Sequence, residues 1–222
     1  MGSYEVSSEQ ALASSIRLIK EGQVQGVKLE GGVDMAPTIA KIVKAGIPVL
    51  GHIGLMPQRF HALGGFKAQG TTCDSAMSVL KDSLALQKAG CFAVVLEAIP
   101  GQVATVITEK LSIPTIGVGA GSGCSGQGLV QVDLVGQLPH HYSVPKFVKR
   151  FGDVWTTARK AMRRYRDEVK SMQYPTTHHA YSVSDEAIEA FRKAASISKN
   201  GNNIDNIVTA IYRSSISLRT NE

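Results

Sequence analysis

Short apolar runs alternate with helical stripes between residues 7 and 135. Five runs predict strands: Gly26–Gly31, Pro48–Leu55, Phe92–Ile99, Ile113–Val118 and Leu129–Val135. Apolar residues recurring every three or four positions predict helices over residues 7–22, Met35–Ala45, Asp74–Ala89 and Gln102–Leu111. Strands and helices that alternate with short connections favour parallel pairing and right-handed crossovers, so we expect an α/β fold.

Local signals set the expected helix boundaries. Ser7 and Gln10 have the spacing of a capping box before the first helix. Three glycines, Gly22, Gly46 and Gly90, are placed to end the first three helices. In the third helix we expect Met77, Leu80 and Leu84 to lie on one face.

The remainder of the chain predicts helices and polar connections, and no further strand. We expect helices over Lys146–Met172, Asp185–Ile197 and Ile207–Leu218, separated by a loop at Tyr174–Ser184 and a polar break at Lys199–Asn206. A closed α/β barrel has eight strands and typically about 250 residues. Five strands therefore indicate either an open sheet or part of a barrel.

Composition excludes several classes of protein. The 222 residues are 43% hydrophobic and 19% charged, as in globular proteins. There is no apolar run of about 18 residues and no signal-peptide pattern at the start, so we expect no membrane span and no secretion. The three cysteines, Cys73, Cys91 and Cys124, lack metal-ligand spacing, which favours a reducing compartment.

The net charge of +6 is concentrated late in the chain. The basic residues there include Lys149, Arg150, Arg159, Lys160, Arg163, Arg164 and Arg166. A nucleic-acid surface and a solvated helix face both fit this run. The interleaved Asp167 and Glu168 and the scarcity of aromatic residues favour the solvated face, and we expect no nucleic-acid partner.

Four chemically active residues fall at the ends of predicted strands: Lys28, Glu30, His52 and Glu97. The carboxyl ends of successive parallel strands meet in one pocket, so these side chains are expected to converge as in a barrel enzyme. Each also has a structural alternative. Lys28 and Glu30 could pair with each other, Glu30 could stabilise a helix dipole, His52 could be a satisfied core histidine, and Glu97 could cap a helix.

Two other patterns are weaker. Gly121, Gly123 and Gly126 spell G-x-G-x-x-G, but the expected strand at Leu129–Val135 follows them, whereas a dinucleotide motif opens a helix. The pairs His140–His141 and His178–His179 lack the spacing for one metal ion and are expected in surface loops.

Six colinear segments carry a resemblance to a known family. VKLEGG, GIPVLGHIGLMPQ, GGFKAQG, AVVLEAIP, IPTIGVGAGSGCSGQ and PKFVKRF resemble ketopantoate hydroxymethyltransferases over residues 2–174. The resemblance implies a (βα)8 barrel of the phosphoenolpyruvate/pyruvate type. It also implies transfer of a hydroxymethyl group from 5,10-methylenetetrahydrofolate to 3-methyl-2-oxobutanoate, with Mg²⁺, in pantothenate biosynthesis.

The resemblance gives each candidate residue a role. It implies that Glu30 is a metal ligand and that Glu97 is the base that removes a substrate proton. Lys28, two residues before Glu30 and so on the same strand face, would bind the substrate carboxylate or oxyanion. His52 would bind the transferred group.

The family has three earlier barrel strands, with two metal-binding aspartates, for which this sequence has no counterpart. We therefore expect residues 1–175 to form the C-terminal part of a barrel and residues 176–222 a helical, polar tail. Two alternatives stay open: a Mg²⁺-dependent 2-oxo acid lyase or mutase of the same superfamily, and a catalytically dead oligomer subunit. Expected partners are a 2-oxo acid, folate and further copies of the chain, in the cytoplasm or mitochondrial matrix.

Overall fold

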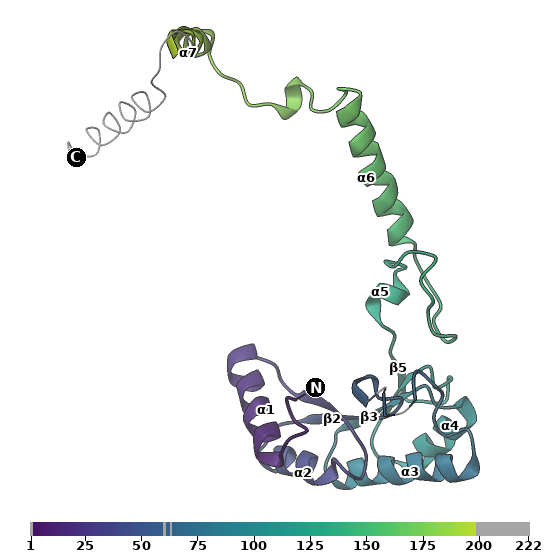
Figure 1. Cartoon of the computed structure of the whole chain (residues 1–222). Helices are drawn as coiled ribbons and strands as arrows, with labels where there is room; N and C mark the ends of the chain where they lie inside the picture. The colour runs from purple at the N-terminus through teal and green to yellow at the C-terminus, as the bar shows by residue number, and fades with distance from the viewer. Residues whose placement is uncertain (1, 60, 63, 199–222) are drawn as a thin grey trace, which may run out of the picture. The chain divides into compact units, whose positions relative to one another are not determined.

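A computed structural model describes residues 2–59, 61–62 and 64–198. The chain divides into two compact units, residues 1–158 and residues 159–222. The first unit contains the whole sheet, and the second contains most of helix α6 and all of α7 (Figure 1). The boundary predicted at residue 175 stays a prediction.

A five-stranded parallel sheet forms the first unit. Its strands are β1 (Val27–Glu30), β2 (Val49–Gly54), β3 (Ala93–Glu97), β4 (Thr115–Val118) and β5 (Gly126–Gln127). They lie side by side in chain order, and every neighbouring pair is parallel. The predicted α/β class with five consecutive parallel strands is confirmed.

Four helices accompany this sheet: α1 (Ser8–Gly22), which packs against α2, and α2 (Ala36–Lys44), α3 (Cys73–Lys88) and α4 (Gly101–Lys110). Helices α2, α3 and α4 lie along the same side of the strands (Figure 1). Alternate strand residues such as Leu29, Val49 and Leu96 join helix residues such as Ile39 and Ile107 in one buried core. A sheet in chain order with its helices on one side has the layering of a barrel wall, whereas a doubly wound sheet has helices on both faces.

The predicted helix signals act largely as expected. Ser7 is the N-cap of α1, and its side chain accepts the N–H of Gln10 at 3.1 Å. Gln10 in turn accepts the N–H of Val6 rather than that of Ser7. The left-handed residue that ends α1 is Gln23, at φ 53°, so Gly22 remains inside the helix.

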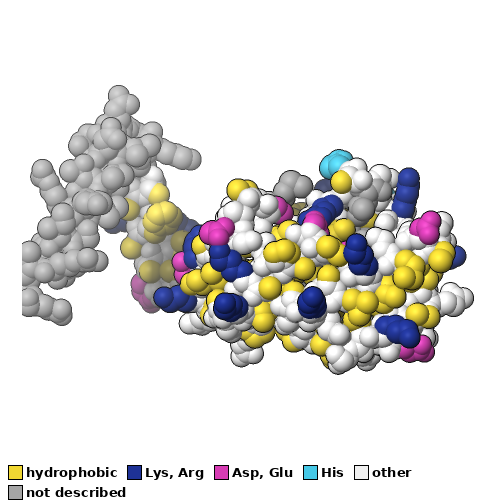
Figure 2. All heavy atoms as spheres, turned by 90° about the horizontal axis from the view of Figure 1, so that it is seen from below, with side chains coloured by type: hydrophobic (Ala, Val, Ile, Leu, Met, Phe, Trp, Pro, Cys, Tyr) yellow, Lys and Arg dark blue, Asp and Glu magenta, His cyan; other side chains and the backbone are white. Residues whose placement is uncertain are grey.

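Of the three residues predicted on one face of α3, only Leu80 packs against the core. Met77 and Leu84 are 58% and 42% exposed, and the buried residues of the helix are Val79, Ser83 and Leu86. Ser83 is tolerated inside because its hydroxyl donates to the carbonyl of Val79 at 2.8 Å. Figure 2 accordingly shows hydrophobic side chains on the outer surface of the helix layer.

The strand predicted at Leu129–Val135 is wrong. The fifth strand is the preceding pair Gly126–Gln127, and residues Gln131–Leu134 form the short helix α5. The carbonyl of Val130 accepts the N–H groups of Asp133 and Leu134, and Gly136 ends the turn at φ 64°. Asp133 therefore lies on a helical turn and not on a strand.

The helix predicted at Lys146–Met172 begins later, as α6 (Val154–Lys170). Asp153 provides the start, because its carboxylate accepts the N–H of Thr156 at 3.1 Å. Helix α7 (Asp185–Ser198) begins where predicted, with Ser184 accepting the N–H of Ala187. The predicted helix Ile207–Leu218 lies outside the described residues, within which no helix is long and apolar enough to span a bilayer.

Candidate active site

The four predicted residues lie on the sheet face that the helices leave uncovered. In the sheet register, Glu30 on β1 is the partner of His52 on β2, and His52 is the partner of Val95 on β3. Glu97 ends β3, two residues after Val95. Lys28 lies two positions before Glu30 on the same face. Glu30, His52 and Glu97 therefore lie toward the carboxyl ends of three neighbouring strands, as predicted.

His52 and Glu97 are in direct contact. Nε2 of His52 lies 3.2 Å from Oε2 of Glu97 and 2.8 Å from the carbonyl oxygen of Leu55. A carbonyl oxygen only accepts, so Nε2 carries the proton and donates toward both oxygens. The histidine is fully buried, while the side chain of Glu97 keeps 16% of its surface exposed. The pair can therefore present a fixed carboxylate to a molecule above the sheet.

The second ring nitrogen of His52 has a different environment. Nδ1 is buried and has no hydrogen-bond partner among the described residues. With the proton on Nε2, this nitrogen has a lone pair and can accept a hydroxyl proton. A buried polar atom without a partner is uncommon and calls for an explanation, which a bound ligand would supply.

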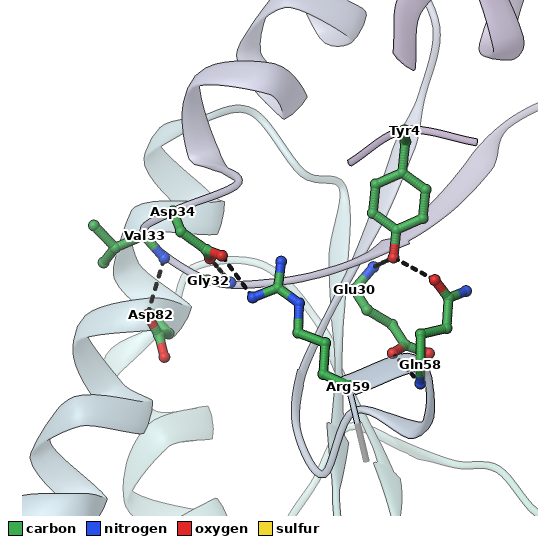
Figure 3. Close-up of polar contacts among 8 residues, drawn as sticks. All are labelled: Tyr4, Glu30, Gly32, Val33, Asp34, Gln58, Arg59 and Asp82. Carbon is green, nitrogen blue, oxygen red and sulfur yellow. Dashed lines mark hydrogen bonds and ion pairs between the residues drawn. The ribbon is translucent and has the colours of Figure 1, made fainter. Parts of the chain in front are cut away.

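Glu30 is held by residues far from it in sequence. Its side chain is buried, with 6% of the residue exposed, and Oε2 accepts the backbone N–H of Gln58 at 3.1 Å. The hydroxyl of Tyr4 lies over the same strand end, where it accepts the N–H of Glu30 at 3.4 Å (Figure 3). Sequence reasoning missed Tyr4, which belongs to no pattern that marks a site. It assigned no role to Gln58, although this residue ends the segment GIPVLGHIGLMPQ.

Lys28 stands apart from this cluster. It is exposed, and it makes no ion pair with Glu30 or with any other residue that the structure describes. The structural alternative of a Lys28–Glu30 pair is therefore not seen. An ammonium group on the uncovered face is available to a carboxylate ligand.

The backbone beside Glu97 is strained. Ala98 has φ 50°, a left-handed conformation that residues with a Cβ rarely adopt. Its N–H donates to the carbonyl of Val118 at 2.8 Å, and its carbonyl accepts the N–H of Gln69 at 2.9 Å. Strain of this kind is concentrated at functional sites, and here the hydrogen bonds fix the peptide that follows Glu97.

The glycine-rich loop after β4 is a close-packed turn. A Cβ on Gly119, at φ 65°, would lie 2.3 Å from the ring of Phe147, and one on Gly121 would lie 2.8 Å from Cα of Gly101. Gly126 starts strand β5 and opens no helix. The glycine motif is therefore not a dinucleotide site, because it leads into the strand β5 and not into a helix. The strand predicted at Leu129–Val135, on which the earlier argument depended, is absent from the described structure.

The described residues offer a divalent cation one carboxylate on β1. Among them, no group of three or more His, Cys, Asp or Glu side chains is arranged to hold a metal ion. The pairs His140–His141 and His178–His179 are exposed, as predicted, although His178 and His179 lie in a 3-10 helix (Thr177–His179) and not in a loop. Glu30 is thus a candidate ligand without a complete set around it.

Comparison with known proteins gives a consistent result. The family model of ketopantoate hydroxymethyltransferase matches residues 1–177. A 3-methyl-2-oxobutanoate hydroxymethyltransferase of Emericella nidulans is 57% identical over 87% of this chain and 56% of its own length. One from Frankia alni is 51% identical over 81% of this chain and 58% of its own. The 3-methyl-2-oxobutanoate hydroxymethyltransferase 1 of Oryza sativa, named as mitochondrial, is 48% identical over 87% of this chain and 54% of its own length.

The chain spans a little more than half the length of these relatives. Among solved structures, one described as a lyase/mutase from Burkholderia cenocepacia J2315 covers 85% of this chain and 66% of its own, at 17% identity. The TM-score of this match is 0.39.

Proposed function

Because this chain belongs to the ketopantoate hydroxymethyltransferase family, we propose that it serves hydroxymethyl transfer to 3-methyl-2-oxobutanoate, giving 2-dehydropantoate in pantothenate biosynthesis. The proposed one-carbon donor is 5,10-methylenetetrahydrofolate. The observation that carries the proposal is the contact between His52 and Glu97, a carboxylate held by a buried imidazole on the open sheet face.

Glu97 is the proposed general base. In the proposed step, a carboxylate oxygen takes the proton from C3 of the 2-oxo acid, and the electron pair left behind forms the enolate. Water adds to the donor's methylene carbon, whose two C–N bonds break to give tetrahydrofolate and formaldehyde. The enolate carbon then bonds to the formaldehyde carbon, and the oxyanion so formed takes a proton to become the hydroxyl. The Nε2 proton of His52 keeps the carboxylate in place, and a base positioned in this way typically contributes about 10²–10⁴ in rate.

The remaining residues have proposed binding roles. The unpaired ammonium of Lys28 would neutralise the substrate carboxylate or the developing oxyanion. The free lone pair on Nδ1 of His52 would accept a hydrogen bond from the transferred hydroxymethyl group. Both roles are the ones that the resemblance to ketopantoate hydroxymethyltransferases implies for these residues.

Bound Mg²⁺ is also proposed, and one residue of the described structure, Glu30, supports it. Mg²⁺ takes a near-octahedral set of oxygen ligands, and when bound it would stabilise an enolate. Glu30 would supply one ligand, but the described residues do not complete the set. No step of the proposed mechanism is therefore assigned to the ion.

A second candidate function is that of a subunit without catalytic activity, which the incomplete set of metal ligands among the described residues favours.

An activity assay distinguishes the two candidate functions. The purified chain is to be incubated with 3-methyl-2-oxobutanoate, labelled methylenetetrahydrofolate and Mg²⁺, and labelled 2-dehydropantoate is to be measured. Formation of labelled product supports the transferase. Its absence, in a sample shown to be folded by circular dichroism, supports the subunit without catalysis.

Partners and compartment follow as proposals. We expect self-association, supported by apolar side chains such as Met77 and Leu84 that lie exposed on the helix layer. A cytoplasmic or mitochondrial location is supported by relatives from rice that are named as mitochondrial.

A further inference from the structure

Glu30 and Gln58 are joined by two separate routes (Figure 3). In one, the backbone N–H of Gln58 donates to Oε2 of Glu30 at 3.1 Å. In the other, the Tyr4 hydroxyl accepts the backbone N–H of Glu30 at 3.4 Å and donates to Oε1 of Gln58 at 2.9 Å. The three hydrogen bonds form a closed ring in which the backbone and the side chain of both residues take part.

Tyr4 suits its place in this ring. It is half-buried and packs against the hydrophobic core. A phenol keeps its proton at neutral pH, so the hydroxyl is available as a donor. The hydroxyl both donates and accepts, which phenylalanine cannot do although its ring would fill the same space.

A neighbouring contact holds the loop independently of Tyr4. Arg59 donates from Nη1 to Oδ2 of Asp34 at 2.6 Å, and Oδ1 of Asp34 accepts the N–H of Gly32. This ion pair ties the segment after β2 to the segment after β1 without involving the Glu30 carboxylate. Loss of the Tyr4 hydroxyl would therefore act on the orientation of Glu30 more than on the folding of the loop.

We propose that Tyr4 is a positioning residue for the Glu30 carboxylate: through Gln58 it fixes Oε2 and leaves Oε1 as the oxygen offered to a ligand. The functional meaning of this orientation rests on the proposed function, in which Glu30 is a metal ligand. Hydrogen bonds from outer residues commonly orient such ligands, and their loss typically lowers metal affinity or activity about 10- to 100-fold.

Amide hydrogen exchange tests the ring itself. In Tyr4→Phe, we expect exchange of the Gln58 amide to accelerate about three- to tenfold, the effect of weakening one hydrogen bond. Gln58→Ala should similarly accelerate exchange of the backbone amide at position 58, because the Tyr4 hydroxyl then loses its acceptor. The matched control Tyr181→Phe removes an equivalent hydroxyl from a fully exposed side chain and should change nothing. Unchanged Gln58 exchange in Tyr4→Phe overturns the proposal.

A double-mutant comparison separates positioning from general packing. Once Glu30→Ala has removed the acceptor, adding Tyr4→Phe should not accelerate Gln58 exchange further, because both changes act on one ring. Full additivity of the two effects would contradict the proposal.

Calorimetric titration with Mg²⁺ and 3-methyl-2-oxobutanoate addresses the functional meaning. If the parent chain binds, Tyr4→Phe should weaken binding about tenfold or more; unchanged affinity would contradict a role for Tyr4 in ligand binding. If the parent chain does not bind, the proposed function loses support, while the exchange measurements still decide the proposal for Tyr4.

Discussion

Nε2 of His52 on β2 donates toward Oε2 of Glu97 at the end of β3, across 3.2 Å. The two residues are 45 positions apart in sequence, and adjacent parallel strands bring them together. Because His52 is fully buried and also bonded to the carbonyl of Leu55, it acts as a rigid support for the more exposed carboxylate.

Replacement of the base is expected to abolish most turnover. In an active preparation of this protein, Glu97→Gln should lower the turnover rate about 10²–10⁴-fold, because an amide cannot accept the C3 proton. Binding of 3-methyl-2-oxobutanoate, followed by calorimetry, should change little. Near-normal turnover in the variant would show that Glu97 is not the base.

Removal of the buried imidazole is expected to destabilise the fold. His52→Ala would leave a cavity and deprive the Leu55 carbonyl of a donor, at a cost of about 2–5 kcal/mol in the free energy of unfolding. The exposed His141 provides the control, with an expected effect of about 0.5 kcal/mol or less for His141→Ala. Urea titration measures both, and equal effects would contradict the structural role.

The two faces of α3 can be distinguished by one pair of substitutions. Leu86 is fully buried, and Leu86→Ala should cost about 2–5 kcal/mol of unfolding free energy. Leu84 is 42% exposed, so Leu84→Ala should cost clearly less. Denaturation of the two variants under identical conditions checks the result, and a reversed order would restore the face predicted from sequence.

Cys91 is expected to make stability fall at alkaline pH. Burial raises the pKa of its thiol from 9.0 to about 11. Below pH 9 the thiol is protonated in both folded and unfolded states, so it has no pH-dependent effect there. Between about pH 9 and 11 the unfolded chain loses the proton first, and this favours unfolding.

Two measurements check the expectation for Cys91. The loss of unfolding free energy between pH 8 and pH 11 should be smaller in Cys91→Ala than in the parent. A thiol reagent at pH 8 should modify the exposed Cys73 in the native protein and reach Cys91 only after denaturant is added. Rapid native labelling of Cys91 would contradict its burial.

The chain is expected to associate and to bind Mg²⁺ weakly. In the described structure, β1 and β5 are edge strands, and unpaired edges promote pairing between chains. Glu30 alone cannot satisfy an ion that holds its waters tightly. Light scattering and calorimetry test the two parts, and a monomer with tight, saturable Mg²⁺ binding would contradict both.

Much of the fold was predictable from local pattern. Apolar runs, helical stripes and the turn glycines predicted four of the five strands, because each signal depends on residues close in sequence. The same pattern placed Glu30, His52 and Glu97 at strand ends, and parallel pairing then requires their convergence on one edge.

Tertiary structure decided what local spacing leaves ambiguous. Both Met77–Leu84 and Val79–Leu86 fit a helical stripe. Packing against the sheet buries the second stripe, and of the first only Leu80 contacts the core. Likewise, Leu129–Val135 is apolar enough for a strand, yet pairing with β4 is taken by Gly126–Gln127 and the later residues close a helical turn.

The ring around Glu30 depends entirely on the folded chain. Tyr4 and Gln58 are separated by 54 positions, and neither residue type signals a site by itself. The sequence determined which groups lie at the strand ends. Their orientation came from hydrogen bonds between distant segments, which form only when the sheet brings those segments together.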